Sequence, residues 1–134
     1  SESAYRDGFE FHSGGGGLVS TLGDYSQFSQ MLAGWGHLNG TRILKAETLK
    51  KMFRNQVLPG GGNSFGLGFA VERAKISGAD KPLGQYGWAG YANTEFRVIP
   101  DAGVSMVFMR QTIPTTHQMS QKLFGILRRG MKIN

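Results

Sequence analysis

The fold is decided by residues 94–110, which read TEFRVIPDAGVSMVFMR. The side chains at 94, 96 and 98 alternate with those at 95, 97 and 99, which is the period of a β-strand. Pro100 and Gly103 bound a short turn suited to a hairpin. A further strand over 104–110 follows directly. The segment therefore predicts an antiparallel pair of strands.

Two more strands are predicted upstream of this pair. Over 65–71 the sequence reads FGLGFAV, in which large apolar residues alternate with Gly and Ala. A strand with one nearly bare face lets another element approach closely. A break over 77–82 separates this strand from the next, over about 84–91. The prediction is an antiparallel sheet of four strands.

Helices are predicted before and after the sheet. Thr21 and Asp24 have the spacing of a capping box, which predicts the start of a helix, and Gly34 ends that helix. An Asn39-Gly40 turn leads to a second helix over about 46–55, and an amphipathic helix is predicted over about 115–131. The apolar stripe of the first helix is Tyr25, Phe28, Leu32 and Trp35. The fold class is α+β, an antiparallel sheet with flanking helices.

Length and composition limit the number of domains and the class of protein. The chain has 134 residues, of which 40% are hydrophobic and 18% charged, as in a globular protein. We expect a single partial domain, with a helical segment over 1–58 and the sheet plus the C-terminal helix over 64–134. There is no cysteine, which excludes a disulfide and leaves the compartment open. No apolar run is long enough to span a bilayer.

The net charge of +6 raises the question of a nucleic-acid partner. Most cations are scattered, and a cluster occurs only near the C-terminus, at Lys122, Arg128, Arg129 and Lys132. Cations in the last turns of a helix complement its dipole and solvate its outer face. We therefore expect no nucleic-acid partner.

Most motifs of catalysis are absent. The chain has no Ser-x-x-Lys, Gly-x-Ser-x-Gly, Lys-Thr-Gly, Walker loop or His-Glu-x-x-His. The glycine run 14–17 lacks the Lys-Ser/Thr of a phosphate-binding loop, and it is interpreted as tight packing before a helix. His12, His37 and His117 are far apart in sequence. The sequence implies no cofactor and no metal.

Four segments carry a family resemblance. They are SGGGGLVST at 13–21, ILKAET at 43–48, FGLGF at 65–69 and GWAG at 87–90. In this order they resemble the C-terminal part of serine β-lactamase-like hydrolases, the class C β-lactamases and family VIII esterases of the penicillin-binding-protein superfamily. Lys45 departs from that pattern, since it cannot cap the second helix. The resemblance spans about residues 12–127 and implies the C-terminal portion of the β-lactamase/transpeptidase-like fold.

The resemblance implies a mechanism and a site. In this family a Ser-x-x-Lys serine attacks an ester or amide carbonyl, assisted by the lysine and by a Tyr from a Tyr-x-Asn/Ser motif. Trp88-Ala89-Gly90 would be the third motif, which binds substrate. The N–H of Tyr91 would be one donor to the oxyanion. Tyr91-Ala92-Asn93 matches Tyr-x-Asn only formally, because the family's motif precedes the third motif.

Trp88 bears on the substrate. Family members with Lys or His at this position offer a cation to a carboxylate, whereas Trp88 offers an apolar wall, which favours neutral esters over β-lactams. Arg97 would supply a cation only if it faced the cleft. As an alternative, Trp88 simply packs at a sheet edge.

Two classes of function remain open. In the first, the chain is the C-terminal fragment of a serine hydrolase acting on a small-molecule ester or lactam, and it is inactive alone because the nucleophile is missing. Its partner is then the N-terminal part of the same protein, or a second copy, since an unpaired sheet edge and apolar surface would be exposed. In the second, the chain is a non-catalytic binding module with a β-lactamase-like fold.

Overall fold

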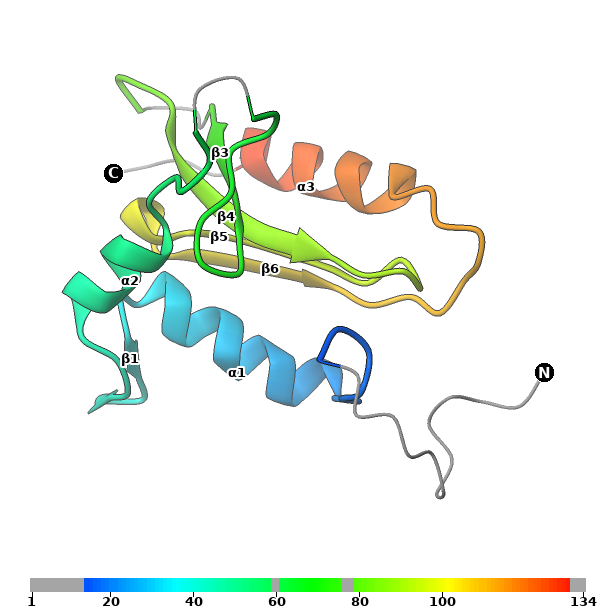
Figure 1. Cartoon of the computed structure of the whole chain (residues 1–134), viewed down its shortest axis with the longest axis horizontal. Coiled ribbons are helices and arrows are strands. Elements are labelled where there is room, and N and C mark those ends of the chain that lie inside the picture. Colours follow the sequence, from blue (N-terminus) through cyan, green and yellow to red (C-terminus); the bar gives the residue numbers. More distant parts are fainter. Residues whose placement is uncertain (1–13, 59–60, 76–78, 131–134) are drawn as a thin grey trace.

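The computed structural model describes residues 14–58, 61–75 and 79–130, so the ends of the chain, Lys132 included, lie outside the described residues. A four-stranded antiparallel sheet has the order β3-β4-β5-β6, and α1 and α3 lie on its opposite faces (Figure 1). The elements are α1 (Leu22–Ala33), β1 (His37–Leu38), β2 (Thr41–Arg42), α2 (Ala46–Met52), β3 (Ala70–Ala74), β4 (Leu83–Ala89), β5 (Glu95–Ile99), the 3-10 helix η1 (Pro100–Ala102), β6 (Val104–Phe108) and α3 (Gln118–Gly130).

The hairpin predicted from residues 94–110 is confirmed. β5 pairs with β6 from Glu95 opposite Phe108 to Ile99 opposite Val104. The turn between them is η1, and Gly103 follows it in the left-handed conformation with φ 63°. Glycine adopts this conformation without the steric cost that a Cβ imposes. The turn residues thus fix the register of the pair.

The local signals of the helical segment are also confirmed. The hydroxyl of Thr21 accepts a hydrogen bond from the Asp24 N–H at 3.1 Å and donates one to the Asp24 carboxylate at 2.8 Å. Asn39 and Gly40, with φ 49° and 78°, form the two-residue turn between β1 and β2. Lys45 makes no capping hydrogen bond at the start of α2, as expected.

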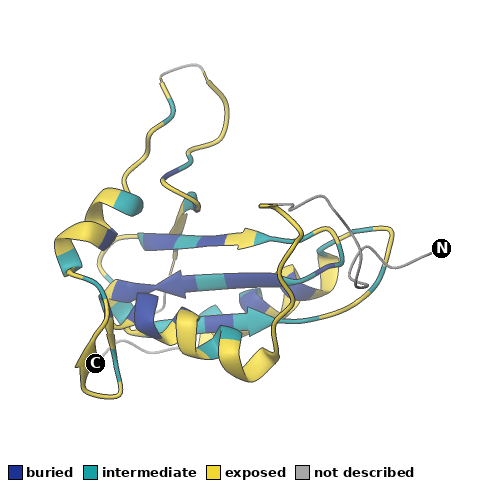
Figure 2. Ribbon diagram, turned by 60° about the horizontal axis from the view of Figure 1, so that its bottom comes forward, coloured by how far each residue is buried: buried dark blue, intermediate teal, exposed yellow. Residues whose placement is uncertain are grey.

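The sheet separates two apolar clusters. Figure 2 shows that many residues of the strands are buried. On the α1 face, Leu32, Leu49 and Val98 are fully buried together with several aromatic rings. On the α3 face the cluster is smaller, and its buried members are Ala74, Ile99, Met106 and Phe124. β5 is buried on both faces, as a central strand should be. Most of the apolar core therefore lies between the sheet and the two N-terminal helices.

The predicted strand over 65–71 is wrong. The regular strand is β3 (Ala70–Ala74), and residues 65–69 form a loop with one isolated bridge between Phe65 and Ala70. Gly68 takes φ 91°, which a strand does not allow, and this breaks the alternation. Three elements are also shorter at their C-terminal ends than predicted: α2 ends at Met52, β4 at Ala89 and β6 at Phe108.

Candidate functional site

The predicted site residues lie together at the end of β4. Trp88 and Ala89 are the last two residues of this strand, and Gly90 and Tyr91 begin the turn that leads to β5. The side chain of Trp88 is 54% exposed and that of Tyr91 is 76% exposed. An exposed tryptophan at a strand end is available for contact with a ligand.

The turn after β4 brings residue 90 close to Thr94. The Gly90 N–H donates to the Thr94 carbonyl at 2.7 Å, and the Asn93 N–H donates to the Gly90 carbonyl at 3.2 Å. A Cβ on Gly90 would lie 2.3 Å from the Thr94 hydroxyl oxygen. A side chain at residue 90 would therefore require the Thr94 hydroxyl to move, whether or not a substrate is present.

The backbone of Tyr91 has an available donor. Within the described part of the chain, no group accepts a hydrogen bond from the Tyr91 N–H, whereas its carbonyl accepts one from the Thr115 hydroxyl. Because Tyr91 is 76% exposed, this N–H is open to water or to a ligand. The hydrogen bond from Thr115 to the Tyr91 carbonyl therefore holds the backbone of the residue that carries this free N–H donor.

Asn93 is an important residue that the sequence did not single out as structural. It is buried, with φ 65°, and its side-chain amide donates to the carbonyls of Thr112 and Pro114. Its Oδ1 accepts from the N–H groups of Thr116 at 2.9 Å and His117 at 3.1 Å. Asn93 thus fastens the β4–β5 turn to the segment before α3. All of its described contacts are with backbone groups, which gives this residue a structural role.

Arg97 does not face Trp88. It is paired across the sheet with Gly87, so its side chain points to the α3 face, opposite to that of Trp88. There its guanidinium lies 2.8 Å from the Glu95 carboxylate and 3.5 Å from that of Glu72. The condition under which Arg97 would supply a cation to a substrate at Trp88 is not met.

Beneath α3 a group of polar side chains surrounds the buried carboxylate of Glu95. Its Oε2 accepts a hydrogen bond from the Ser120 hydroxyl at 2.5 Å and lies 3.6 Å from the Nδ1 of His117. Because Arg97 pairs with its other oxygen, both oxygens of Glu95 have partners. This arrangement joins the start of α3 to the middle of the sheet. It lies on the face away from Trp88, so it is not part of the candidate site.

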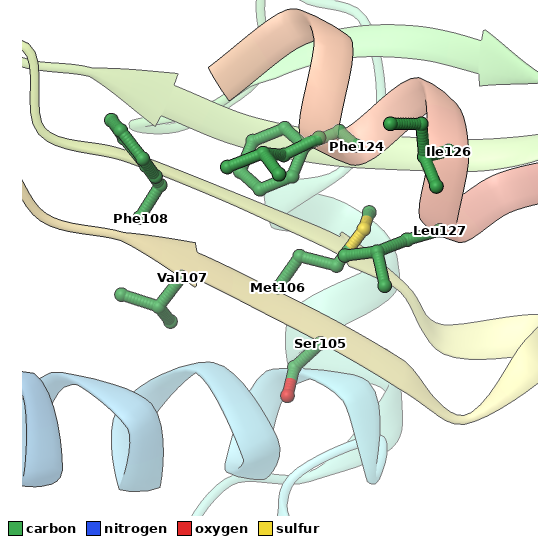
Figure 3. A pocket seen from close by; sticks show the side chains of 8 residues that line it. Ser105, Met106, Val107, Phe108, Phe124, Ile126 and Leu127 are labelled. Carbon is green, nitrogen blue, oxygen red and sulfur yellow. The ribbon is translucent and has the colours of Figure 1, made fainter. Parts of the chain in front are cut away.

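A groove opens between α3 and β6, the strand at one end of the sheet order (Figure 3). Its lining is mostly apolar and comes from both elements: Ser105, Met106, Val107, Phe108, Leu123, Phe124, Ile126 and Leu127. β6 is the strand at one end of the sheet order and β4 is an inner strand. The groove and the candidate site are therefore separate features.

In the part of the chain that the structure describes, no three His, Asp or Glu side chains gather where they could hold a metal ion. The same residues contain no helix long and apolar enough to cross a membrane.

Comparison with known proteins gives the class of this chain. A family model described as Beta-lactamase matches residues 1–124, and the chain belongs to that family. Two curated relatives from Mycobacterium tuberculosis, Protein Rv1367c of strain ATCC 25618 / H37Rv and the uncharacterized protein MT1414 of strain CDC 1551 / Oshkosh, are each 30% identical over 120 residues. Each alignment covers 78% of this chain and 30% of the relative, so the chain spans under a third of their length.

A solved structure shows the same fold. The crystal structure of a family VIII carboxylesterase aligns with a TM-score of 0.52 and 22% identity, over 66% of this chain and 25% of that one. The predicted family and fold class, an antiparallel sheet with flanking helices related to β-lactamases and esterases, are thus confirmed.

Proposed function

We propose that this chain is the C-terminal part of a serine hydrolase that acts on esters or β-lactam-like amides through an acyl-enzyme, as one partial domain. The observation that carries the proposal is the end of β4, where an exposed Trp88 is followed three residues later by Tyr91, whose N–H has no acceptor among the described residues. The Beta-lactamase family and the esterase fold support a hydrolase. The nucleophile, a Ser-x-x-Lys serine, would lie in a preceding segment of a longer polypeptide.

In the proposed reaction the serine oxygen bonds to the substrate carbonyl carbon, and the carbonyl oxygen becomes an oxyanion. The Tyr91 N–H and the N–H of the serine donate to that oxyanion. The alcohol or amine then leaves with the serine's proton, and water hydrolyses the acyl-enzyme to release the acid. One donor aimed at the oxyanion stabilises the transition state by about 3 kcal/mol. Trp88, Ala89 and Gly90 line the substrate, and Trp88, which offers an apolar wall and no cation, favours a neutral ester over a β-lactam.

The sharpest test removes the Tyr91 N–H. In the longer protein, Tyr91→Pro deletes this donor without breaking a hydrogen bond of the described backbone, and Tyr91→Ala keeps it. We expect Tyr91→Pro to lower kcat for p-nitrophenyl acetate by about 100-fold with KM little changed, and Tyr91→Ala to have an effect of less than about threefold. Equal activity of the two variants, both folded by circular dichroism, would refute the role of Tyr91.

The 134-residue chain alone is expected to be inactive. Turnover of p-nitrophenyl acetate by this chain, blocked by a serine-reactive phosphonate, would contradict the proposal. A longer protein without Ser-x-x-Lys would instead support the alternative of a non-catalytic binding module, which the absence of that motif from these 134 residues keeps open.

We also propose that the preceding part of the same polypeptide covers the groove between β6 and α3. β6 is at one end of the sheet order, and four apolar side chains of α3 are between 42% and 56% exposed: Met119, Leu123, Ile126 and Leu127. An open strand edge beside apolar surface favours association. Native mass spectrometry of the 134-residue chain should show a retained partner or self-association. A folded, monodisperse monomer would count against this proposal.

A further inference from the structure

The loop before β3 places a second aromatic ring against Trp88. The ring of Phe65 meets that of Trp88 edge to face, with centroids 4.8 Å apart and planes at 84°. Leu67, two residues further along the loop, is 56% exposed. Edge-to-face packing is a favoured arrangement of aromatic pairs, and here it leaves more than half of Trp88 exposed. The two rings form a corner at the site rather than a buried core contact.

The backbone of Phe65 is held on both sides. Its N–H donates to the side-chain oxygen of Asn55 at 3.0 Å, and its carbonyl accepts from the Gln56 N–H at 2.8 Å. The same Asn55 side chain accepts from the Val57 N–H at 3.1 Å and donates to the Val57 carbonyl at 3.1 Å. Asn55 therefore links the segment after α2 to the loop that carries Phe65.

The rest of the loop is seated on the end of α2. The Leu67 N–H donates to the Met52 carbonyl at 2.8 Å. A Cβ on Gly66 would lie only 2.1 Å from that carbonyl oxygen, so the loop backbone approaches α2 as closely as a glycine allows. The Phe65 ring is half-buried, and because its backbone is held in this way it loses little conformational entropy when a ligand binds.

From this geometry we infer that Phe65 is a specificity-determining residue, which together with Trp88 forms an aromatic corner for an uncharged aryl group of the ester. Asn55 is a positioning residue that acts through the Phe65 backbone. The inference rests on the proposed role of Trp88 in substrate binding. An uncharged group is favoured because the guanidinium of Arg97, on the neighbouring strand, is turned to the opposite face and neutralised there by Glu95 and Glu72.

The test compares an aryl ester with an alkyl ester on the longer protein. Phe65→Ala should lower kcat/KM for phenyl acetate by about fivefold, the value of one aromatic pair, and for ethyl acetate by less than about twofold. Phe65→Tyr, which keeps the ring, should retain the preference for the aryl ester. The ratio of the two kcat/KM values is the readout, because general damage to the fold lowers both alike.

Asn55 offers a matched pair of variants. Asn55→Ala removes the acceptor for the Phe65 N–H and should lower the aryl preference, whereas Asn55→Asp keeps an acceptor oxygen and should preserve it. If both esters are hydrolysed and no Phe65 or Asn55 variant changes the ratio, the inference is wrong while the proposed function stands.

If neither ester is hydrolysed, the ester activity in the proposed function is refuted, and binding still decides the inference. Phenyl acetate is titrated into the 134-residue chain while the Trp88 indole N–H is followed by NMR, with assignment from Trp88→Phe. A saturable shift that weakens at least threefold in Phe65→Ala supports the aromatic corner. No shift, or an equal shift in both proteins, overturns it. Leu18→Ala, at a residue that is 94% exposed, is the control variant and should bind like the parent chain.

Discussion

The two faces of the sheet are attached to their helices by different physical means. On the α1 face the contacts are apolar rings, with Phe96 packed edge to face on Tyr25, Phe28 and Phe69. On the α3 face the sheet carries a row of charged and polar groups, and Arg128 of α3 donates to Gln85 of β4 at 2.8 Å. The first face gains its stability mainly from apolar burial, whereas the second adds to a smaller apolar cluster a set of buried polar groups that each need a partner.

This difference predicts that truncating a buried side chain on the α1 face lowers the free energy of unfolding the most. Phe96 is 4% exposed and contacts three other rings, so Phe96→Ala should lower the free energy of unfolding by about 4 kcal/mol. Phe28 is 39% exposed, so Phe28→Ala, the matched control, should cost about 1 kcal/mol. Urea unfolding measures both. Equal losses would show that this face is not the core of the molecule.

On the α3 face, removing one partner of the Arg97–Glu95 pair should lower the free energy of unfolding more than removing both charges. Arg97→Met leaves the Glu95 carboxylate, whose side chain is 2% exposed, without its cation, and should cost about 3 kcal/mol. In Glu95→Gln/Arg97→Met no charge is buried, and the double variant should unfold within about 1 kcal/mol of the parent chain. A double variant as unstable as the single one would mean that the pair itself stabilises the fold.

The same contrast explains how much was predictable from the sequence. The alternation over 94–99 and the Pro100 turn gave the β5–β6 hairpin, because side-chain period and turn geometry are local properties. The corner of Phe65 and Trp88 was not predicted, because the 65–71 alternation resembled a strand. Its true conformation depends on Asn55 and Met52, which contact the loop only in the folded chain.

The roles of the polar residues also depend on tertiary contacts that local sequence signals do not reveal. The position of Arg97 on the α3 face follows from strand register, which the sequence left open. Asn93 stood in a formal match to a catalytic motif, and only tertiary structure reveals that its amide is used by the backbone of 112–117. By contrast, Trp88, Ala89, Gly90 and Tyr91 were chosen through a family resemblance, and their catalytic roles stay predictions.

A third substitution tests the link between the site and the α3 face. Asn93→Gly keeps the positive φ without strain but removes the acceptor for the Thr116 and His117 N–H groups. We expect a loss of about 2 kcal/mol in the free energy of unfolding, together with faster hydrogen exchange at these two amides. Unchanged exchange there would mean that the segment before α3 is held by other contacts.

The smallest expected effect is a pH dependence of the free energy of unfolding, caused by two tyrosines on the α1 face. Burial raises the pKa of Tyr86 above its ordinary value of 10.0, the Asp101 carboxylate adds to the rise and Arg73 opposes it. Burial also raises the pKa of Tyr25. As the pH rises above 10.0, the unfolded chain loses these protons first, so stability should fall from that value until the folded groups titrate. Tyr25→Phe/Tyr86→Phe should flatten this decline in unfolding curves recorded up to about pH 11. A decline that is unchanged in the double variant would assign it to groups outside the α1 face.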